Sequence, residues 1–274
     1  PDARLEATWA RVRRTGGPPA LTTLWAQTAE GVHDRCGLPA LARNGLEYVA
    51  GFYGIQMSGA TAVPINTSID AEWLRYLLED CEAKALLTEG GFAKLATPVL
   101  AAQASTMSST QPSSRNRRCF VLTSDPAAFT SHQTPSEIVD WGENMDAGDP
   151  MSSSISPDDR AAIIYTSGST GKPRGAVLTH RNLVANTESI IQYLELTEQD
   201  RMMVVLPFFY VYGQSLLNTH TWIGGSLLLG TDFMFPNDVV KRMARDEATG
   251  LAGVPSTFAL LLNRTKLAET DLPS

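Results

Sequence analysis

The chain has 274 residues, enough for one large domain or for two smaller ones. Its 22 basic and 29 acidic residues give a formal net charge of −7, and no long basic run is present, which argues against a nucleic-acid partner. The three cysteines, Cys36, Cys81 and Cys119, lie far apart and form no C-x-x-C pair. The sequence therefore predicts neither a disulfide framework nor a metal site made by the protein.

The start of the chain and its most apolar stretch both lack the pattern of a targeting or membrane segment. Residues 1–17 are charged and have no apolar centre, which excludes a secretory signal peptide there. The apolar run from Met202 to Tyr212 is too short to cross a bilayer and contains Pro207, which indicates a buried strand that leaves into a loop. We therefore expect a cytoplasmic protein with no transmembrane segment. Because no closing element follows Ser274, we also expect a piece of a longer protein.

Helices and strands alternate in the first part of the chain. The periodicity predicts a helix over 46–57, a strand over 60–65, a helix over 71–81 and a strand over 84–88. The second helix has an apolar face and two candidate N-caps, Ser68 and Asp70; the face consists of Leu74, Leu77, Leu78 and Cys81. This alternation indicates a parallel sheet covered by helices.

Two stretches rich in small and polar residues, 101–118 and 123–157, are predicted to be surface loops that separate two lobes. The expected lobes are 1–150 and 151–274. The second should open with a buried strand over 161–166, a Gly/Ser/Thr loop and a helix from about Arg181 to Leu194. Alternation then continues, with strands predicted over 202–206, 226–229 and 250–253 and helices over 213–222, 237–246 and 256–263.

The loop after the predicted 161–166 strand combines glycines, hydroxyl side chains and cations within eleven residues, YTSGSTGKPRG. Glycines let backbone N–H groups converge on an anion, hydroxyls add hydrogen-bond donors, and a lysine supplies positive charge where a leaving group becomes negative. A polyphosphate ligand would satisfy all of them. The candidate ligand-binding residues are Thr166, Ser167, Gly168, Ser169, Thr170, Gly171, Lys172, Arg174 and Gly175.

A plain linker and a Walker-type phosphate loop are the two other interpretations of this segment. Gly/Ser/Thr stretches are most often plain linkers, although a linker need not follow an apolar strand or carry Lys and Arg in one tight turn. The G-x-x-x-x-G-K-[ST] loop of kinase-like and GTPase-like NTPases does not fit, because Pro173 follows Lys172 and because Gly168 and Gly171 are too close together. A phosphate loop of a different kind is favoured.

The segment YTSGSTGKPRGAVLTHRNL, Tyr165 to Leu183, resembles the signature loop of the adenylate-forming superfamily, which includes acyl- and aryl-CoA ligases, luciferases and peptide-synthetase adenylation domains. Arg174 stands where the family commonly has Lys. The similarity extends upstream to Arg43–Glu89 and downstream to Leu206–Ser215 and Gly253–Leu262, although the strand before Arg43 looks degenerate. The resemblance implies an α/β fold with two helix-covered, largely parallel sheets, as in the large N-terminal domain of these enzymes, here truncated.

The motif LPFFYVYGQS, Leu206 to Ser215, is similar to the family's substrate-side motif. The resemblance implies that Phe209, Tyr210, Tyr212 and Gly213 bind the acid, with Tyr210 as a gate, although core packing would also explain the aromatic residues. Amino-acid-activating relatives carry an aspartate in this motif, and none is present here. An acid without an α-amine, fatty or aromatic, is therefore favoured. His180 and His220 have no partner that suggests catalysis, and we expect both to be structural.

The resemblance further implies a two-step reaction that uses ATP with Mg²⁺. The carboxylate attacks the α-phosphate to give an acyl-adenylate and pyrophosphate, and then a thiol, of coenzyme A or of a carrier protein, displaces AMP. Lys172 and Thr170 would stabilise the leaving pyrophosphate. The family's ribose-binding aspartate and catalytic lysine have no match after Gly230. The alternatives are a non-catalytic nucleotide-binding fragment or half of a split protein, and, more weakly, a Walker-type NTPase.

Overall fold

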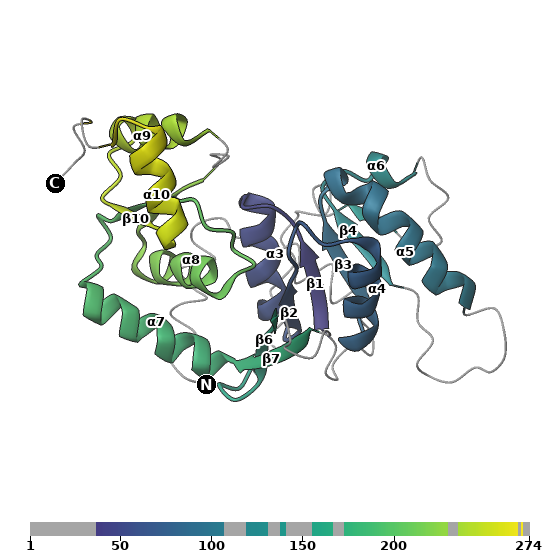
Figure 1. The fold of residues 1–274 in the computed structure, drawn as a ribbon. Coiled ribbons are helices and arrows are strands. Elements are labelled where there is room, and N and C mark those ends of the chain that lie inside the picture. Colours follow the sequence, from purple (N-terminus) through teal and green to yellow (C-terminus); the bar gives the residue numbers. More distant parts are fainter. Residues whose placement is uncertain are drawn as a thin grey trace. The chain divides into compact units, whose positions relative to one another are not determined.

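The structure is a computed structural model that describes residues 37–106, 119–130, 138–140, 155–166, 173–229, 235–267 and 270. The chain divides into two compact units between His180 and Arg181 (Figure 1). This boundary differs from the expected one at 150, because the strand over 160–166 and the strand after it join the sheet of the first unit.

The described part of the first unit is built on a seven-stranded sheet with the order β5-β4-β3-β1-β2-β6-β7. All neighbouring strands run parallel except β6 and β7, which form an antiparallel hairpin. The strands are β1 (Gly37–Leu41), β2 (Thr61–Pro64), β3 (Ala85–Thr88), β4 (Phe120–Thr123), β5 (Ile138–Asp140), β6 (Arg160–Thr166) and β7 (Arg174–Thr179). The three central strands β1, β2 and β3 are buried along their whole length, as expected of parallel strands with helices on both faces.

Helices connect these strands: α3 (Leu46–Met57), α4 (Ala71–Asp80), a 3-10 turn η1 (Gly90–Phe92), α5 (Ala93–Thr106) and α6 (Ala127–Thr130). The connection from β1 to β2 runs in one direction along the sheet and that from β2 to β3 runs in the other. Because such connections are right-handed, α3 covers one face, whereas α4 and α5 cover the opposite face (Figure 1). The predicted apolar face of α4 is confirmed, since Leu74, Leu77 and Leu78 pack into the core of this unit.

The second unit contains a three-stranded parallel sheet with the order β10-β8-β9 in its described part. Its elements are α7 (His180–Leu194), β8 (Arg201–Val204), α8 (Val211–Ile223), β9 (Ser226–Leu228), α9 (Pro236–Arg245), β10 (Gly250–Ala252) and α10 (Pro255–Arg264). The core forms where α9 and α10 bury Val239, Val240, Met243 and Leu261 beside Met203 of β8. The predicted alternation of strand and helix in this half is confirmed.

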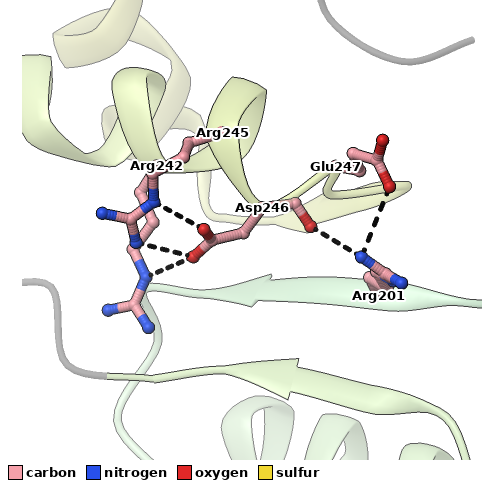
Figure 2. Close-up of polar contacts among 5 residues, drawn as sticks. All are labelled: Arg201, Arg242, Arg245, Asp246 and Glu247. Carbon is pink, nitrogen blue, oxygen red and sulfur yellow. Dashed lines mark hydrogen bonds and ion pairs between the residues drawn. The ribbon is translucent and has the colours of Figure 1, made fainter.

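An ion-pair cluster ties the end of α9 to β8 (Figure 2). Asp246 accepts hydrogen bonds from Arg245 Nε at 2.6 Å and from Arg242 Nε at 3.0 Å, and these hydrogen bonds lower the pKa of its carboxyl to about 2. Arg201 donates to the backbone oxygen of Asp246 at 3.2 Å and pairs with Glu247 at 3.5 Å. Three arginines thus share two carboxylates, and their contacts join the end of α9 to β8.

Several observed elements lie where loops were predicted or where no strand was expected. The last turns of α5, together with α6 and β5, fall in the two stretches expected to be loops. Strand β4 lies between these stretches, where no strand was expected, and β1 occupies the stretch whose strand looked degenerate. Helix α5 has Pro98 in its interior and only weak separation of apolar and polar faces, and β5 has three residues, so none of them gives a strong periodic signal. Residues 107–118, 131–137 and 141–154 of those stretches lie outside the described residues.

Within the part of the chain that the structure describes, no helix combines the length and the apolar character needed to cross a membrane.

The structure also decides between the two candidate N-caps of α4. Asp70 Oδ1 accepts a hydrogen bond from the backbone N–H of Trp73 at 2.9 Å, whereas Ser68 lies outside the helix. We expect Asp70→Ala to lower the free energy of unfolding by about 1 kcal/mol, because the first-turn amide loses its acceptor. Ser68→Ala is the matched control and should change it by less than about 0.5 kcal/mol. Urea titration measures both, and equal effects would contradict the assignment.

Candidate functional site

The predicted phosphate loop connects the two strands of the β6–β7 hairpin. Thr166 pairs with Arg174 and Tyr165 pairs with Gly175 at the end of the ladder, so the turn between them spans residues 167–173. Ser167, Gly168, Ser169, Thr170, Gly171 and Lys172 lie outside the described residues. At the edge of the turn, Thr166 and Arg174 are both exposed, and the Thr166 hydroxyl lies 3.5 Å from the Arg174 carbonyl oxygen.

The arrangement around the turn differs from the predicted order of strand, glycine loop and helix. Strand β7 intervenes, and α7 begins only at His180. The sequence does not predict a strand over 174–179, because the segment begins with Arg and Gly, which are typical of the preceding loop. The remaining residues of the strand are Ala, Val, Leu and Thr. The turn is thus held by two paired strands, and it does not lead into a helix N-terminus as was expected.

The turn leaves the sheet at a place where ligands commonly bind. Strand β6 is parallel to β2, so the turn follows the carboxyl end of a parallel strand. The chain after β2 crosses to the β3 side of the sheet, whereas the chain after β6 continues to β7 at the opposite edge. Adjacent parallel strands whose outgoing connections diverge in this way form a topological switch point, and open α/β sheets bind ligands outside the carboxyl ends of such strands.

Two residues of α4 hydrogen-bond the chain on both sides of the turn. Tyr165, just before the turn, donates its hydroxyl to Asp80 Oδ2 at 2.5 Å. Tyr76 lies within hydrogen-bonding distance of two acceptors, the Pro173 carbonyl oxygen at 3.2 Å and Asp80 Oδ1 at 3.4 Å. Burial, and next the hydrogen bond with Asp80, raise the pKa of Tyr165, so its hydroxyl stays protonated and available as a donor.

Gly175 has a packing role that explains why no side chain is present. A Cβ atom there would meet Ile163 Cγ2 at 2.6 Å and the ring of Tyr165 at 3.3 Å. Any side chain would therefore displace the Ile163 side chain and also crowd the Tyr165 ring, both on the neighbouring strand. The sequence prediction that Gly175 contacts a phosphate stays a prediction, while this close packing is observed directly.

The predicted acid-binding residues lie in the second unit, around the start of α8. Phe208 is fully buried, and the ring of Phe209 packs on that of Tyr210 with centroids 4.5 Å apart. Tyr210 and Tyr212 are about half exposed, so their rings offer apolar surface together with a polar hydroxyl group. On α10, Leu261 is fully buried in the core, whereas Phe258 keeps 40% of its surface exposed.

Gly213 is buried and lets two backbone segments approach closely. A Cβ atom at this position would overlap the carbonyl group of Pro207 and lie 3.2 Å from the Leu206 oxygen. Pro207 also accepts a hydrogen bond from the Tyr210 amide at 3.2 Å, which closes the turn that precedes α8. The glycine is therefore required by the turn that presents Phe209 and Tyr210.

Both histidines considered in the sequence are buried, with exposures of 2% for His180 and 1% for His220. Burial lowers the pKa of His180 to about 4 and also lowers that of His220. Nδ1 of His220 lies 3.0 Å from the Leu216 carbonyl oxygen of its own helix. These contacts support the structural role that the sequence predicts for them. In the described ranges, no three His, Cys, Asp or Glu side chains gather as a metal-binding cluster.

Tyr76 and Asp80 were missed as functional candidates by the sequence analysis. The Tyr165–Asp80 hydrogen bond joins residues 85 positions apart, and that from Tyr76 to Pro173 spans 97 positions. In the sequence, both residues appear only as polar positions on an amphipathic helix. A polar side chain in the last turns of a helix that leads to a central strand was the one available signal.

Comparison with known proteins places this hairpin in a family. The model of the AMP-binding enzyme family matches residues 31–274, which include both the β6–β7 turn and the motif at the start of α8. The chain belongs to the AMP-binding enzyme family. Its matched region is thus nearly the whole chain, in agreement with the resemblance stated from the sequence.

Individual relatives support this assignment. The chain is 28% identical to the 2-succinylbenzoate–CoA ligase of Bacillus velezensis, over 85% of this chain and 41% of the relative. It is 27% identical to the oxalate–CoA ligase of Arabidopsis thaliana, over 84% of this chain and 42% of that protein. The chain thus spans less than half the length of these two curated relatives.

The fold is similar to that of the N-terminal domain of FACL13 from Mycobacterium tuberculosis, whose crystal structure has an inhibitor bound. The TM-score is 0.71 at 23% identity, over 93% of this chain and 58% of that domain. This likeness confirms the predicted α/β fold with two largely parallel sheets.

The close approach at Gly213 leads to a stability prediction. Gly213→Ala should lower the free energy of unfolding by about 1–3 kcal/mol, because the added methyl group overlaps the Pro207 carbonyl. Tyr212→Ala removes a whole half-exposed ring next to it and should cost less. Urea unfolding of the two variants compares them, and a smaller loss for the glycine variant would contradict this role.

The buried His180 leads to a pH prediction. Its pKa is about 4 in the folded chain and near the ordinary 6.5 when unfolded, so between these values the unfolded state binds more protons. Stability should therefore fall as the pH drops from about 6.5 towards 4, by up to roughly 3 kcal/mol from this residue. Unfolding of His180→Gln at several pH values should show a flatter dependence than the wild type. The exposed variant Gln192→Ala should keep the wild-type slope, and an unchanged slope in His180→Gln would refute the prediction.

Proposed function

We propose that the protein to which this chain belongs activates a carboxylic acid with ATP. A carboxylate oxygen of the acid forms a bond to the α-phosphorus, the bond from that phosphorus to the oxygen bridging to the β-phosphate breaks, and pyrophosphate leaves with the electron pair. The sulfur of a thiol then forms a bond to the acyl carbon, and the bond from that carbon to the AMP oxygen breaks. AMP leaves with the electron pair, and the thiol loses its proton. The observation that carries the proposal is the β6–β7 turn: a TSGSTGKP sequence at the carboxyl edge of a parallel strand, bonded to α4 on both sides.

In this proposal the turn binds the β- and γ-phosphates of ATP. Lys172 and Thr170 stabilise the negative charge that develops on pyrophosphate, and glycines 168 and 171 let backbone amides approach the phosphate oxygens. The hydroxyls of Thr166, Ser167 and Ser169 add donors, and Arg174, exposed at the start of β7, adds positive charge. Mg²⁺ would reach the site with the nucleotide, since it binds mainly through phosphate oxygens and water. Catalysis by this turn is positioning and electrostatics.

The acid lacks an α-ammonium group in our proposal. Residues Leu206–Ser215 contain no carboxylate that could pair with a buried cation, and they present Phe209, Tyr210 and Tyr212. Two relatives are named as ligases that join 2-succinylbenzoate and oxalate to coenzyme A, and both names describe acids without an amine. We infer a fatty or aromatic acid and a thiol acceptor, which is coenzyme A or a carrier-protein thiol.

A second candidate function needs only the β6–β7 turn, namely nucleotide binding without catalysis. A nucleotide-binding piece without its own chemistry, or one half of a split enzyme, would keep the β6–β7 turn and depend on other segments for turnover. The two candidates differ in one observable, the exchange of labelled pyrophosphate into ATP in the presence of an acid.

The combined variant Lys172→Ala and Thr170→Ala should weaken ATP and pyrophosphate binding by roughly tenfold or more, because it removes charge-assisted hydrogen bonds to phosphate. Isothermal titration calorimetry measures the affinity, and circular dichroism should show an intact fold. The control Lys241→Ala removes an exposed lysine of α9 and should leave affinity unchanged. Equal affinities in wild type and double variant would count against this turn as the phosphate site.

A protein extended to the full gene should exchange pyrophosphate with ATP only when a suitable acid is present. Aliphatic and aryl acids should support exchange, and amino acids should not. ATP binding without exchange for any acid would favour the non-catalytic candidate, and steady ATP hydrolysis without an acid would indicate an NTPase.

A further inference from the structure

We propose that the last turns of α4 act as a brace that positions the β6–β7 turn, with Asp80 and Tyr76 as positioning residues. The inference rests on the proposed function, since it assigns these residues to the same phosphate-binding turn. It concerns only the two flanks of the turn, which the structure describes. Neither residue contacts the nucleotide in this proposal.

The brace holds the chain on both sides of the turn. Asp80 receives the Tyr165 hydroxyl at 2.5 Å on the side of β6. Tyr76 lies 3.2 Å from the Pro173 carbonyl oxygen on the side of β7. Because the two residues are one helical turn apart on the same face of α4, a single rigid element sets the separation of the two flanks.

Helix α4 is itself firmly held, so it can serve as a reference for the hairpin. Its first turn is capped by Asp70, and Leu74, Leu77 and Leu78 anchor it in the core. The rings of Trp73 and Tyr76 also meet edge to face, with centroids 5.7 Å apart, which limits the rotation of the Tyr76 side chain. Motion of the two flanks of the turn relative to α4 therefore requires these hydrogen bonds to break.

Such support matters at the end of the β6–β7 hairpin that leads into the turn. Thr166 and Arg174 form the last described pair of the hairpin, and the Thr166 hydroxyl is 3.5 Å from the Arg174 carbonyl oxygen, a weak hydrogen bond. A phosphate site depends on amides held close to their productive geometry, and support from neighbouring side chains commonly provides this precision. The Tyr165 ring also lies on Gly175, so moving Tyr165 would disturb both strands.

Asp80 is an anion near a proposed anion site, so in this proposal it acts on the turn through Tyr165 and does not contact the phosphates. Direct contact between its carboxylate and a phosphate would be repulsive. Its Oδ2 instead accepts the Tyr165 hydroxyl, which lies between the carboxylate and the backbone of β6. The interaction with the nucleotide is thus indirect, and its loss should change the geometry of the turn before it changes the local charge.

The test uses the full chain and three single variants, Tyr165→Phe, Tyr76→Phe and Asp80→Asn. Tyr193→Phe, a change of the same kind at a residue with 73% exposure on α7, is the control. Hydrogen exchange followed by mass spectrometry reports the exchange rates of the backbone amides at the end of the β6–β7 ladder next to the turn. We expect these amides to exchange roughly tenfold faster in Tyr165→Phe and Tyr76→Phe, and at the wild-type rate in the control.

Nucleotide affinity distinguishes a positioning role from a purely structural one. We expect Tyr165→Phe and Tyr76→Phe to bind ATP and pyrophosphate about three- to tenfold more weakly, with AMP affinity unchanged, because AMP lacks the phosphates that the turn would bind. Asp80→Asn keeps a carbonyl oxygen as acceptor and should retain most of the ATP affinity. Removing both partners in Tyr165→Phe with Asp80→Asn should cost little more than Tyr165→Phe alone.

The outcomes separate this inference from the proposed function. Unchanged exchange rates in the Tyr→Phe variants overturn the brace, and faster exchange with unchanged ATP affinity overturns its positioning role. Equal losses for ATP and AMP would mean a general structural effect and would also overturn it. A wild-type chain that binds neither ATP nor pyrophosphate counts against the proposed function and the positioning role together, while the exchange rates still show whether the hydrogen bonds hold the hairpin.

Discussion

The position of the candidate phosphate turn depends on how β6 joins the central sheet. The two strands β2 and β6 share a single register pair, Ala62 with Ala162, and side chains complete the junction. The buried amide of Gln56 donates to the Ala161 carbonyl oxygen at 3.3 Å, and the Thr61 hydroxyl donates to that of Arg160 at 3.4 Å. Backbone carbonyls buried without partners are costly, so these side chains allow β6 to lie beside β2 where the ladder is incomplete. The hairpin and its turn follow from that junction.

Each unit places its functional candidates on turns that a packed scaffold supports. In the first unit, the turn follows a buried parallel sheet and is bonded to α4. In the second, the turn before α8 is closed by the Tyr210–Pro207 hydrogen bond and requires the missing side chain of Gly213. Binding residues on loops that a rigid core positions are a general feature of enzymes. The two buried histidines belong to the scaffold, which is why their pKa values affect stability and carry no proposed catalytic role.

Sequence reasoning predicted the regular elements well where periodicity was strong. Helix α3 has the predicted bounds, and the ends of α4 and of the strands and helices of the second unit differ from the predicted ends by at most two residues. It failed for β4, β5 and β7, which are short or contain residues typical of turns, because tertiary pairing and not local pattern makes them strands. The family of the phosphate turn could be predicted because its glycines, hydroxyls and cations are contiguous in sequence. Asp80 and Tyr76 could not, since their link to the turn exists only after the sheet has formed.

The central claim is that the β6–β7 turn binds the triphosphate of a nucleotide. A crystal structure of the chain with a non-hydrolysable ATP analogue and Mg²⁺ tests this most directly. The account predicts density for the β- and γ-phosphates between Thr166 and Arg174, with backbone amides of the turn and the Lys172 ammonium group within about 3 Å of phosphate oxygens. Triphosphate density elsewhere on the chain, or a turn whose amides point away from a common centre, would contradict it.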